Sequence, residues 1–359
     1  MDYEGQICRA PMERSSFMLP VMVGCSYNQC KFCNLFRHLK YRELPMEQIE
    51  AELKRVRELH GKPKKIFLGD GNAFGLKTEK LYEILDLIAY YFPECEGINM
   101  DATVTSILHK SQEELEMLAR KKVKHLYLGI ESGLDDVLKF MKKDHDLAQA
   151  YQAIDRLHEA GLIYDAHIMT GVAGKGRGME NAEALAQFLN RTNPAHVVNF
   201  SMFLHKEVPL YQDIRQGIFV PADELETIRE EYHLIERIAP EKAGANILYD
   251  GFHDFIHVRV RGHLPGDKEK MLAKLNGIIQ EYEGKEPVYS FVQGECPDLE
   301  YCDDGKAVWD MDRKTSYNPL YYESAEIERV NRCALELWNR KYVIKNPLYL
   351  IFQLQWILI

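Results

Sequence analysis

The sequence predicts an α/β protein whose core is a partial (β/α)6 TIM-like barrel with a C-terminal α+β extension. From residue 17 to about residue 238, short apolar runs alternate with segments of helical period, which is the pattern of β-α units around a parallel sheet. The chain has 359 residues and is 46% hydrophobic, so it can bury one large core or two modest ones. Six such units fit an incomplete barrel.

Six strands are predicted along this segment, and each is a short apolar run that ends at turn residues or at a helical segment. In chain order they are residues 17–23, 65–68, 98–100, 125–130, 164–169 and 196–203. Helices between them make the strands parallel, so the residues that follow each strand gather at one mouth of the barrel.

The predicted helices begin and end at capping signals. Residues 46–59 place apolar side chains at helical spacing after Pro45, and Gly61 follows as a stop. Ser111 and Glu114 form a capping-box pattern before the next apolar residues. Further helices are predicted at 79–90, 147–160, 180–190 and 223–238. Each is long enough to connect two parallel strands.

The alternating pattern ends near Pro240, and this change defines the expected domains. They are an N-terminal lead at 1–16, the barrel core at 17–238, a C-terminal α+β segment at 239–289 and a tail of unassigned fold at 290–359. The α+β segment includes a helix at 267–282, and the tail a helical stretch near 325–339. The tail ends in an apolar run at 347–359, which we expect to be buried against the protein or a second subunit.

Charge and composition exclude several classes of protein. The formal net charge is −10, which does not favour a nucleic acid as partner. Eight cysteines in 359 residues are too few for a disulfide framework, so we expect a reducing cytoplasm. The N-terminus lacks the regions of a signal peptide, and no run reaches the roughly 18–20 apolar residues of a membrane helix. No membrane partner is expected.

Three cysteines lie in the loop after the first strand, at positions 25, 30 and 33. Three thiolates can ligate three irons of a four-iron four-sulfur cluster and leave the fourth iron open. The alternative is a zinc-stabilised binding module with His38 as the fourth ligand. Structural zinc sites usually pair two Cys-x2-Cys units and no second unit exists here, so the cluster is favoured. The remaining cysteines, which are Cys8, Cys95, Cys296, Cys302 and Cys333, are interpreted as free thiols.

This loop, Gly-Cys-Ser-Tyr-Asn-Gln-Cys-Lys-Phe-Cys, resembles the radical S-adenosylmethionine (radical SAM) superfamily. The usual signature is Cys-x3-Cys-x2-Cys with an aromatic residue before the last cysteine, which Phe32 supplies. Four residues separate Cys25 from Cys30, as in a branch with a Gly-Cys-Ser-(Tyr/His)-Asn-x-Cys-x-Phe-Cys loop. The resemblance to that branch does not identify the reaction.

The resemblance implies a mechanism and partners. Cys25, Cys30 and Cys33 would hold a [4Fe-4S] cluster whose open iron binds SAM, and one electron would cleave SAM to a 5′-deoxyadenosyl radical. That radical would abstract hydrogen from a substrate that the sequence does not name, which is chemistry of the oxidoreductase kind. A reductant such as flavodoxin or ferredoxin would be the electron-donating partner.

Two further motifs resemble SAM-binding elements of the superfamily. Gly69, Asp70, Gly71 and Asn72 follow the second strand, where the superfamily has a Gly-Gly-Glu-like turn that receives the amino group of SAM. Gly129-Ile130-Glu131-Ser132-Gly133 follows the fourth strand and resembles a Gly-x-Glu-Ser-Gly motif, which makes Glu131 both a cofactor-binding and a catalytic candidate. The alternatives are an ordinary turn and a helix N-cap carboxylate, respectively.

Other polar residues are expected to gather at the same mouth, namely Asp101, Thr103, Thr170, Gly171, Asn199 and Ser201. A second function class also remains open, an iron-sulfur electron-transfer or scaffold protein without radical catalysis. It would account for the three cysteines but not for the two glycine-rich motifs at the same end of the barrel. Formation of 5′-deoxyadenosine would separate the two classes.

Overall fold

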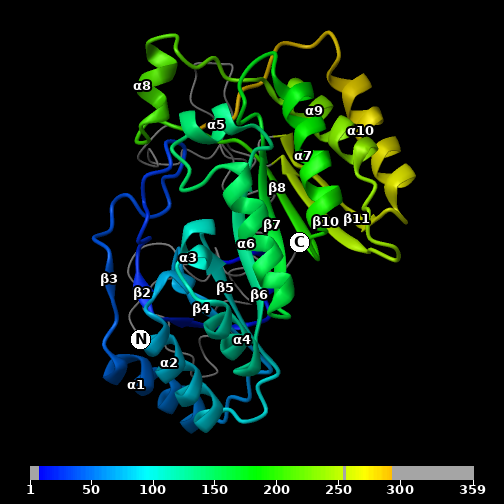
Figure 1. Ribbon diagram of the computed structural model, residues 1–359. Helices are drawn as coiled ribbons and strands as arrows, with labels where there is room; N and C mark the ends of the chain where they lie inside the picture. The colour runs from blue at the N-terminus through cyan, green and yellow to red at the C-terminus, as the bar shows by residue number, and fades with distance from the viewer. Residues whose placement is uncertain (1–7, 254–255, 293–359) are drawn as a thin grey trace, which may run out of the picture.

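The computed structural model describes residues 8–253 and 256–292 (Figure 1). Most of the expected tail, with Cys296, Cys302, Cys333, the helical stretch at 325–339 and the apolar run at 347–359, lies outside the described residues. Within them, none of the helices combines the length and the apolar character that crossing a membrane requires.

One eight-stranded sheet forms the core, in the order β1-β4-β5-β6-β7-β8-β10-β11. Every neighbouring pair from β1 to β10 is parallel, and β11 pairs with β10 antiparallel. The strands are β1 (Phe17–Pro20), β4 (Lys65–Gly69), β5 (Gly97–Ala102), β6 (Val123–Glu131), β7 (Ile163–Thr170), β8 (His196–Ser201), β10 (Ile247–His253) and β11 (Val258–Leu264). This is the mixed α/β, mostly parallel architecture of a partial TIM-like barrel, as the sequence predicts.

The structure changes the prediction for the first strand. The apolar run 17–23 is broken, because β2 (Met22–Val23) leaves the main sheet and pairs antiparallel with β3 (Arg42–Glu43). A third short sheet pairs β9 (Leu204–His205) with β12 (Phe291–Val292). The chain between β2 and β3 therefore forms a long loop anchored at both ends, and this loop carries the three cysteines.

Helices cover the outer side of the sheet (Figure 1). Ser111 caps its helix as predicted, since its hydroxyl accepts from the Glu114 amide at 3.2 Å and the Glu114 carboxylate accepts from the Ser111 amide at 2.6 Å. The helices are α1 (Met46–Glu58), α2 (Thr78–Tyr91), α3 (Val104–Leu108), α4 (Gln112–Arg120), α5 (Asp135–Phe140), α6 (Leu147–Glu159), α7 (Gly178–Thr192), α8 (Leu210–Arg215), α9 (Glu224–Arg237) and α10 (Lys268–Tyr282). Two 3-10 turns, η1 (Pro11–Glu13) and η2 (Ala73–Gly75), complete the described elements.

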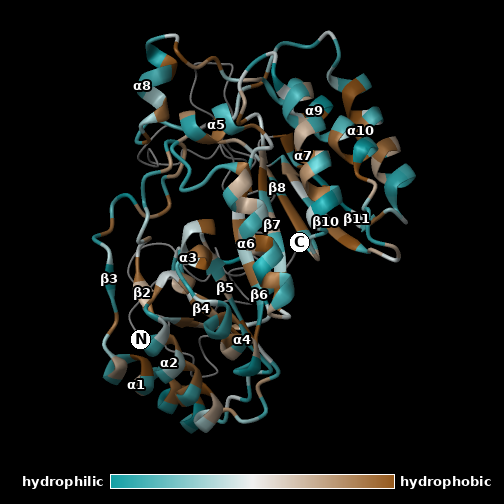
Figure 2. Cartoon of the chain, viewed as in Figure 1, coloured by the Kyte–Doolittle hydropathy of each residue, from teal (hydrophilic) through white to brown (hydrophobic). Residues whose placement is uncertain are grey.

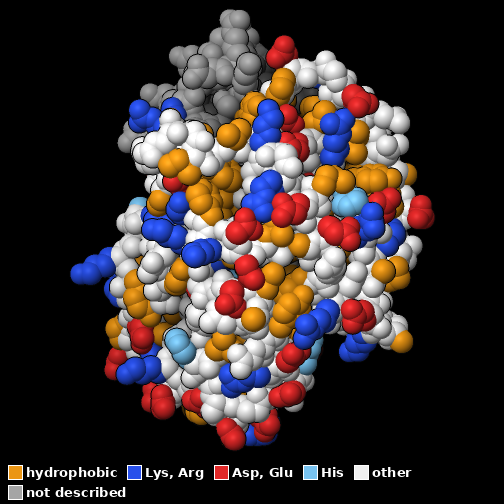
Figure 3. Space-filling model, turned by 45° about the horizontal axis from the view of Figure 1, so that its top comes forward, with side chains coloured by type: hydrophobic (Ala, Val, Ile, Leu, Met, Phe, Trp, Pro, Cys, Tyr) orange, Lys and Arg blue, Asp and Glu red, His pale blue; other side chains and the backbone are white. Residues whose placement is uncertain are grey.

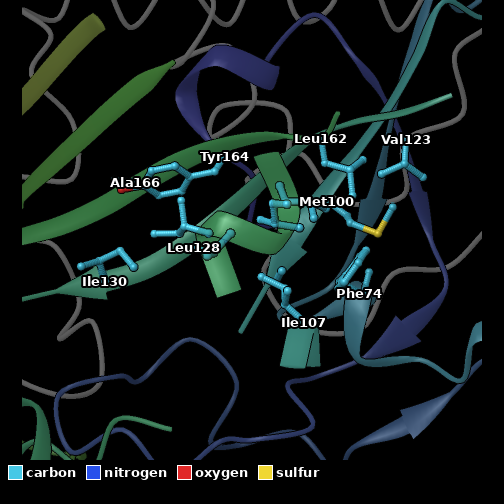
Figure 4. Close-up of a cluster of buried hydrophobic side chains, with 14 of the residues drawn as sticks. Phe74, Met100, Ile107, Val123, Leu128, Ile130, Leu162, Tyr164 and Ala166 are labelled. Atoms are coloured by element: carbon cyan, nitrogen blue, oxygen red, sulfur yellow. The ribbon is translucent and has the colours of Figure 1, made fainter. Parts of the chain in front are cut away.

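The main core lies between the sheet and the helices. Strand side chains of one face, such as Leu128 and Tyr164, pack with Phe74 and Ile107 in this core (Figure 4). The hydropathy colouring follows the same division, with brown strands behind helices that carry teal residues (Figure 2). Because alternate strand residues point to opposite faces, the remaining strand residues form an inner face of the barrel.

Aromatic rings mark this inner face. Ring contacts run from Phe67 to Tyr127, from Tyr127 to His167, from His167 to Phe200 and from Phe200 to Phe252. They cross β4, β6, β7, β8 and β10 in turn. On the same strands Asp101, Gly129, His167, Met169 and Phe200 are partly exposed, so side chains do not bury the inner face completely.

The N-terminal segment covers the amino end of this inner face. Ala10 packs with Met18, Phe67 and Tyr127. The buried Glu13 carboxylate accepts from Asn99 Nδ2 at 2.7 Å and from the Tyr127 hydroxyl at 2.6 Å. Packed side chains of the N-terminal segment therefore cover part of the inner face at the end opposite the cysteine loop.

Candidate functional site

The cysteine loop lies at the carboxyl end of the parallel strands, as expected. Cys25, Cys30 and Cys33 are free and partly buried. The Arg37 guanidinium fixes the loop backbone, since Nε donates to the Cys33 carbonyl at 2.7 Å and a terminal nitrogen donates to the Cys30 carbonyl. Asn28 takes a left-handed conformation, φ 44°, and its amide donates to the Phe36 carbonyl at 3.2 Å. The three thiols thus stand on a backbone that the rest of the loop holds in place.

The spacing of the thiols argues against a single zinc ion. Four tetrahedral sulfur ligands of zinc lie about 3.8 Å apart. Among the described residues, one group of three or more potential ligand atoms falls within 4.8 Å of one another, and it contains neither the three cysteines nor His38. The three cysteine sulfurs do not all lie within 4.8 Å of one another, and this wider spacing suits an iron-sulfur cluster better than one zinc ion. Burial raises the pKa of Cys30 to about 11, so this thiol has little tendency to ionise without a bound cation.

The predicted Gly69–Asn72 turn contacts the cysteine loop directly. A Cβ at Gly71 would lie 2.8 Å from the Cys25 Cβ, so only glycine fits there. Asn72 Nδ2 donates to the Ser26 hydroxyl at 3.0 Å, and its Oδ1 accepts from the Thr103 amide at 3.1 Å. The turn therefore ties the cysteine loop to the carboxyl ends of β4 and β5.

Asp70 is the charged residue of this turn, and it is buried. Burial raises its pKa to about 7, although a hydrogen bond with the Gly24 backbone acts in the opposite direction. A carboxyl group with a raised pKa beside a candidate ligand site can exchange a proton near neutral pH or accept a cationic group.

Glu131 is the last residue of β6 and takes a left-handed conformation, φ 64°. Its Oε1 accepts from Lys143 Nζ at 3.2 Å, and both side chains are buried, with 12% and 7% exposure. A Cβ at Gly129 would lie 2.5 Å from Glu131 Oε1 and 2.9 Å from Lys143 Nζ. The glycine that precedes Glu131 by two residues therefore makes room for the ion pair.

The N-cap interpretation of Glu131 is wrong. Helix α5 has Leu134 at its N-cap position and no side-chain capping bond. The Ser132 hydroxyl accepts from the Leu134 amide at 3.2 Å and donates to Asn181 Oδ1 at 2.6 Å. A Cβ at Gly133 would lie 2.4 Å from the Leu185 amide nitrogen of α7. Ser132 and Gly133 thus serve local hydrogen bonding and packing, and Glu131 remains a candidate for the site.

Lys143 is a candidate site residue that the sequence did not reveal. It follows a short helix within the charged run Lys142-Lys143-Asp144-His145, which looks like an ordinary solvated surface. Its Nζ lies 6.0 Å from the Phe32 ring centroid. Burial would lower the pKa of Lys143, but the neighbouring Cys30, Glu131 and Asp144 outweigh burial and raise it. Lys143 is therefore a cation at neutral pH, next to the cysteine loop.

Two of the polar residues expected at the mouth point elsewhere. Asn199 Nδ2 donates to Glu231 Oε1 at 3.1 Å, and the Ser201 hydroxyl donates to Glu224 Oε1 at 3.0 Å. Both bonds lead to α9 on the outer side of the sheet, so the expectation for this pair is wrong. The alternation of a strand explains the error, because one residue of difference changes the face.

The buried atoms that have no hydrogen-bond partner include Asp101 Oδ1 and His167 Nε2 of the inner face. Burial raises the pKa of Asp101 to about 8 and lowers that of His167 to about 4. Both groups are thus mainly neutral at pH 7. Buried polar atoms without partners are expected where a ligand supplies the missing bonds.

Charges of both signs are mixed over the face drawn in Figure 3, without a continuous basic surface there. This agrees with the acidic net charge of −10.

A family model described as the Radical SAM superfamily matches residues 19–189. The match therefore runs from β1 into α7 and includes the cysteine loop, the Gly69–Asn72 turn and Glu131. The predicted family is confirmed for this part of the chain, and the cofactors that this family uses are the predicted [4Fe-4S] cluster and SAM.

Curated relatives are more distant. A tRNA-2-methylthio-N(6)-dimethylallyladenosine synthase of Herpetosiphon aurantiacus is 25% identical over 166 residues, which are 45% of this chain and 38% of that protein. An uncharacterized protein of Methanocaldococcus jannaschii is 22% identical over 293 residues, 77% of this chain and 88% of that protein. Among solved structures, methylornithine synthase superposes with a TM-score of 0.47 at 16% identity, over 90% of this chain and 81% of that one.

Proposed function

Residues 19–189 of this chain belong to the radical SAM superfamily, and from this premise we propose that the protein is an enzyme that binds one [4Fe-4S] cluster at Cys25, Cys30 and Cys33 together with SAM. One observation carries the proposal. The cysteine loop, the Gly69–Asn72 turn and the Glu131–Lys143 pair meet at the carboxyl end of the same sheet, where barrel active sites lie.

The residues present fit the cluster. Three thiols, more widely spaced than a zinc tetrahedron allows, leave one iron of a four-iron cluster without a protein ligand. Lys143 would offset part of the negative charge that three thiolates bring to a buried position. Phe32, which packs beside Lys143, would shield the cluster from water.

The residues also fit SAM, which carries an amino and a carboxylate group. We assign the Gly69–Asn72 turn to the amino group, because Gly71 allows close backbone approach and Asp70 offers a carboxyl group. Glu131 is assigned to a polar group of the same cofactor, with Lys143 holding its carboxylate in place at 3.2 Å. When bound, the cluster and SAM would supply one-electron reductive cleavage to a 5′-deoxyadenosyl radical.

The chain's own contribution would then be binding, orientation and exclusion of water. The partly exposed residues Asp101, His167, Met169 and Phe200 line the inner face below the cysteine loop. We propose that the substrate lies against them, with hydrogen bonds to Asp101 and His167. Reaction at one C–H bond needs a substrate that is held in one position, since a radical reacts with whatever lies nearest.

We keep the domain division at 16, 238 and 289 as part of this proposal. Strand β10 continues the sheet beyond residue 238, beside β8, so the α+β segment would extend the barrel wall rather than form a separate body. A flavodoxin or ferredoxin as reductant and a cytoplasmic location are proposed with it.

The test is anaerobic reconstitution of the full chain with iron and sulfide, followed by reduction with dithionite in the presence of SAM. We expect about four irons per chain and formation of 5′-deoxyadenosine, both lost in Cys30→Ala. The matched control is Cys95→Ala, because Cys95 is buried far along the chain from the loop and bonds to the Gly97 carbonyl.

The other outcomes separate the rival classes. A complete cluster without 5′-deoxyadenosine would indicate an electron-transfer or scaffold protein. Stoichiometric zinc at the cysteines and no iron after reconstitution would indicate a zinc-stabilised binding module.

A further inference from the structure

A second group of potential metal ligands lies at the opposite end of the barrel. His125 is the third residue of β6, Asp165 the third residue of β7 and His196 the first residue of β8. His125 and Glu131 are six residues apart on the same strand, which corresponds to about 20 Å. The group is therefore separate from the cysteine loop and from Glu131.

The three side chains converge on the Asp165 carboxylate. His125 Nδ1 lies 2.6 Å from Oδ2, and His196 Nδ1 lies 3.5 Å from Oδ1. The two imidazole rings stack nearly in parallel, with centroids 5.4 Å apart and 11° between their planes. All three ligand atoms fall within 4.8 Å of one another. Each carboxylate oxygen thus faces one ring nitrogen.

The contact between His196 and Asp165 is not a hydrogen bond. His196 Nδ1 is buried and has no hydrogen-bond partner, and 3.5 Å to Asp165 Oδ1 is too long for a good bond. A buried ring nitrogen that faces a carboxylate oxygen across this distance leaves room for a cation.

The surroundings hold the group in position. Asp165 is fully buried, and its Oδ1 accepts from the His196 amide at 2.9 Å. The His125 amide donates to Asn99 Oδ1 at 3.0 Å. Such bonds to neighbouring groups orient metal ligands in known sites. The two histidine side chains are 20% and 22% exposed, so the group lies close to the surface of the protein.

We propose that His125, Asp165 and His196 form a binding site for a divalent metal ion of the zinc type, with water as the fourth ligand. Two imidazoles and one carboxylate are a ligand set that zinc accepts. Nitrogen and oxygen ligands of tetrahedral zinc lie about 3.3 Å apart. The distance between His196 and Asp165 is already close to this value, and His125 would move away from Asp165 by about 0.7 Å.

The role of this ion would be to join three neighbouring strands. His125, Asp165 and His196 belong to β6, β7 and β8, which lie side by side in the sheet. At the amino end of a barrel, bound groups serve stability rather than reaction. The site would therefore fix the end of the barrel that lies away from the cysteine loop.

The test uses the full chain with its iron-sulfur cluster reconstituted, stripped of other metals and then given one equivalent of zinc. X-ray absorption at the zinc edge is blind to iron and distinguishes ligand types. We expect nitrogen and oxygen neighbours at about 2.0–2.1 Å. Sulfur neighbours at about 2.3 Å would place zinc on cysteine and overturn the proposal.

Variants locate the site. We expect His196→Gln to weaken zinc binding at least tenfold while its iron content stays unchanged. The matched control His109→Ala, at an exposed histidine that ends α3, should bind zinc as the unchanged chain does. Equal zinc affinity in His196→Gln would overturn the proposal. If that variant fails to fold, the absorption spectrum of the unchanged chain still decides.

Discussion

Lys143 and Glu131 form a buried ion pair between the end of β6 and the segment that follows α5. Removing one member of a buried pair leaves an unpaired charge, which costs about 3–5 kcal/mol. The pair therefore fixes the carboxylate at the carboxyl end of β6. A ligand that took the place of Lys143 would find the Glu131 carboxylate already oriented to accept a hydrogen bond.

The first prediction concerns the affinity for SAM. Glu131→Gln should retain the iron content but bind SAM about 10- to 150-fold more weakly, since a charged hydrogen bond contributes about 1.5–3 kcal/mol. Isothermal titration calorimetry of the reconstituted chain measures this directly. Glu116→Gln, at a surface ion pair with Arg120, is the control. An unchanged affinity in Glu131→Gln would remove Glu131 from the cofactor site.

The second prediction concerns pH. Burial raises the pKa of Asp101 to about 8, so the folded chain holds this proton more tightly than the unfolded chain. The stability that Asp101 contributes is fully present below pH about 4 and is lost as pH rises towards 8. Asp101→Asn should thus lose less stability than the unchanged chain between pH 5 and pH 8.

Urea unfolding at the two pH values measures that difference. The control is Asp155→Asn, since Asp155 lies exposed on α6. Parallel pH profiles for Asp101→Asn and the unchanged chain would contradict the raised pKa.

Single residues also show which parts of the candidate site the sequence could predict and which it could not. The three cysteines, Gly71 and Glu131 belong to motifs whose spacing can be recognised in the sequence. Lys143 belongs to no such motif. Its role depends on burial against Phe32 and Glu131, and the charged run in which it lies does not indicate burial. His125, Asp165 and His196 likewise come together only through the register of three parallel strands.

At the scale of elements, Gly133 allows α7 to lie close to the end of β6. The Gly133 Cα faces backbone atoms of Ala184 and Leu185, and a Cβ there would lie 2.4 Å from the nearest of them. Backbone atoms cannot move aside as a flexible side chain can. The helix would have to shift away from the strand that carries Glu131.

The third prediction follows from this contact. Gly133→Ala should destabilise the fold by about 1–3 kcal/mol, the usual range for overpacking. Gly277→Ala in α10 is the matched control, since nothing lies within 4 Å of its Cβ position and alanine favours a helix by up to about 1 kcal/mol. Thermal unfolding followed by circular dichroism compares the two. A Gly133→Ala variant as stable as Gly277→Ala would show that α7 adapts freely.

Elements were predicted where their periodicity is strong. The six parallel strands and the Ser111 cap follow from apolar runs and capping residues. The break between β1 and β2 does not, because Pro20-Val21-Met22-Val23 is as apolar as a continuous strand. Its cause is tertiary, since the Val21 amide bonds to Gly69 while β2 pairs with β3.

At the scale of the molecule, the sheet of the described residues extends past the six predicted units. Strand β10 adds a seventh parallel strand, and β11 pairs with it in the opposite direction. The sequence indicated an α+β segment at 239–289 but not which strand of the sheet it would extend. Sheet order depends on which edge is free, and that information is not local in sequence.

The fourth prediction concerns the tail. Deleting residues 348–359 should lower the stability of the chain or expose an apolar surface, because burying about five large apolar side chains contributes roughly 7–15 kcal/mol at most. The cluster should persist, since its ligands lie in 25–33. Thermal unfolding and light scattering test this. A truncated chain that is equally stable and monomeric, together with ready proteolysis of the intact tail, would contradict it.

The packing of the N-terminal segment has a consequence for synthesis on the ribosome. Glu13 bonds to Asn99 and Tyr127, which lie 86 and 114 residues further along the chain. Its partners do not exist until β5 and β6 have emerged, so the segment made first is placed late. Contacts this distant in sequence slow folding. The N-terminal segment can therefore take its place at the end of the barrel only after the central strands have formed.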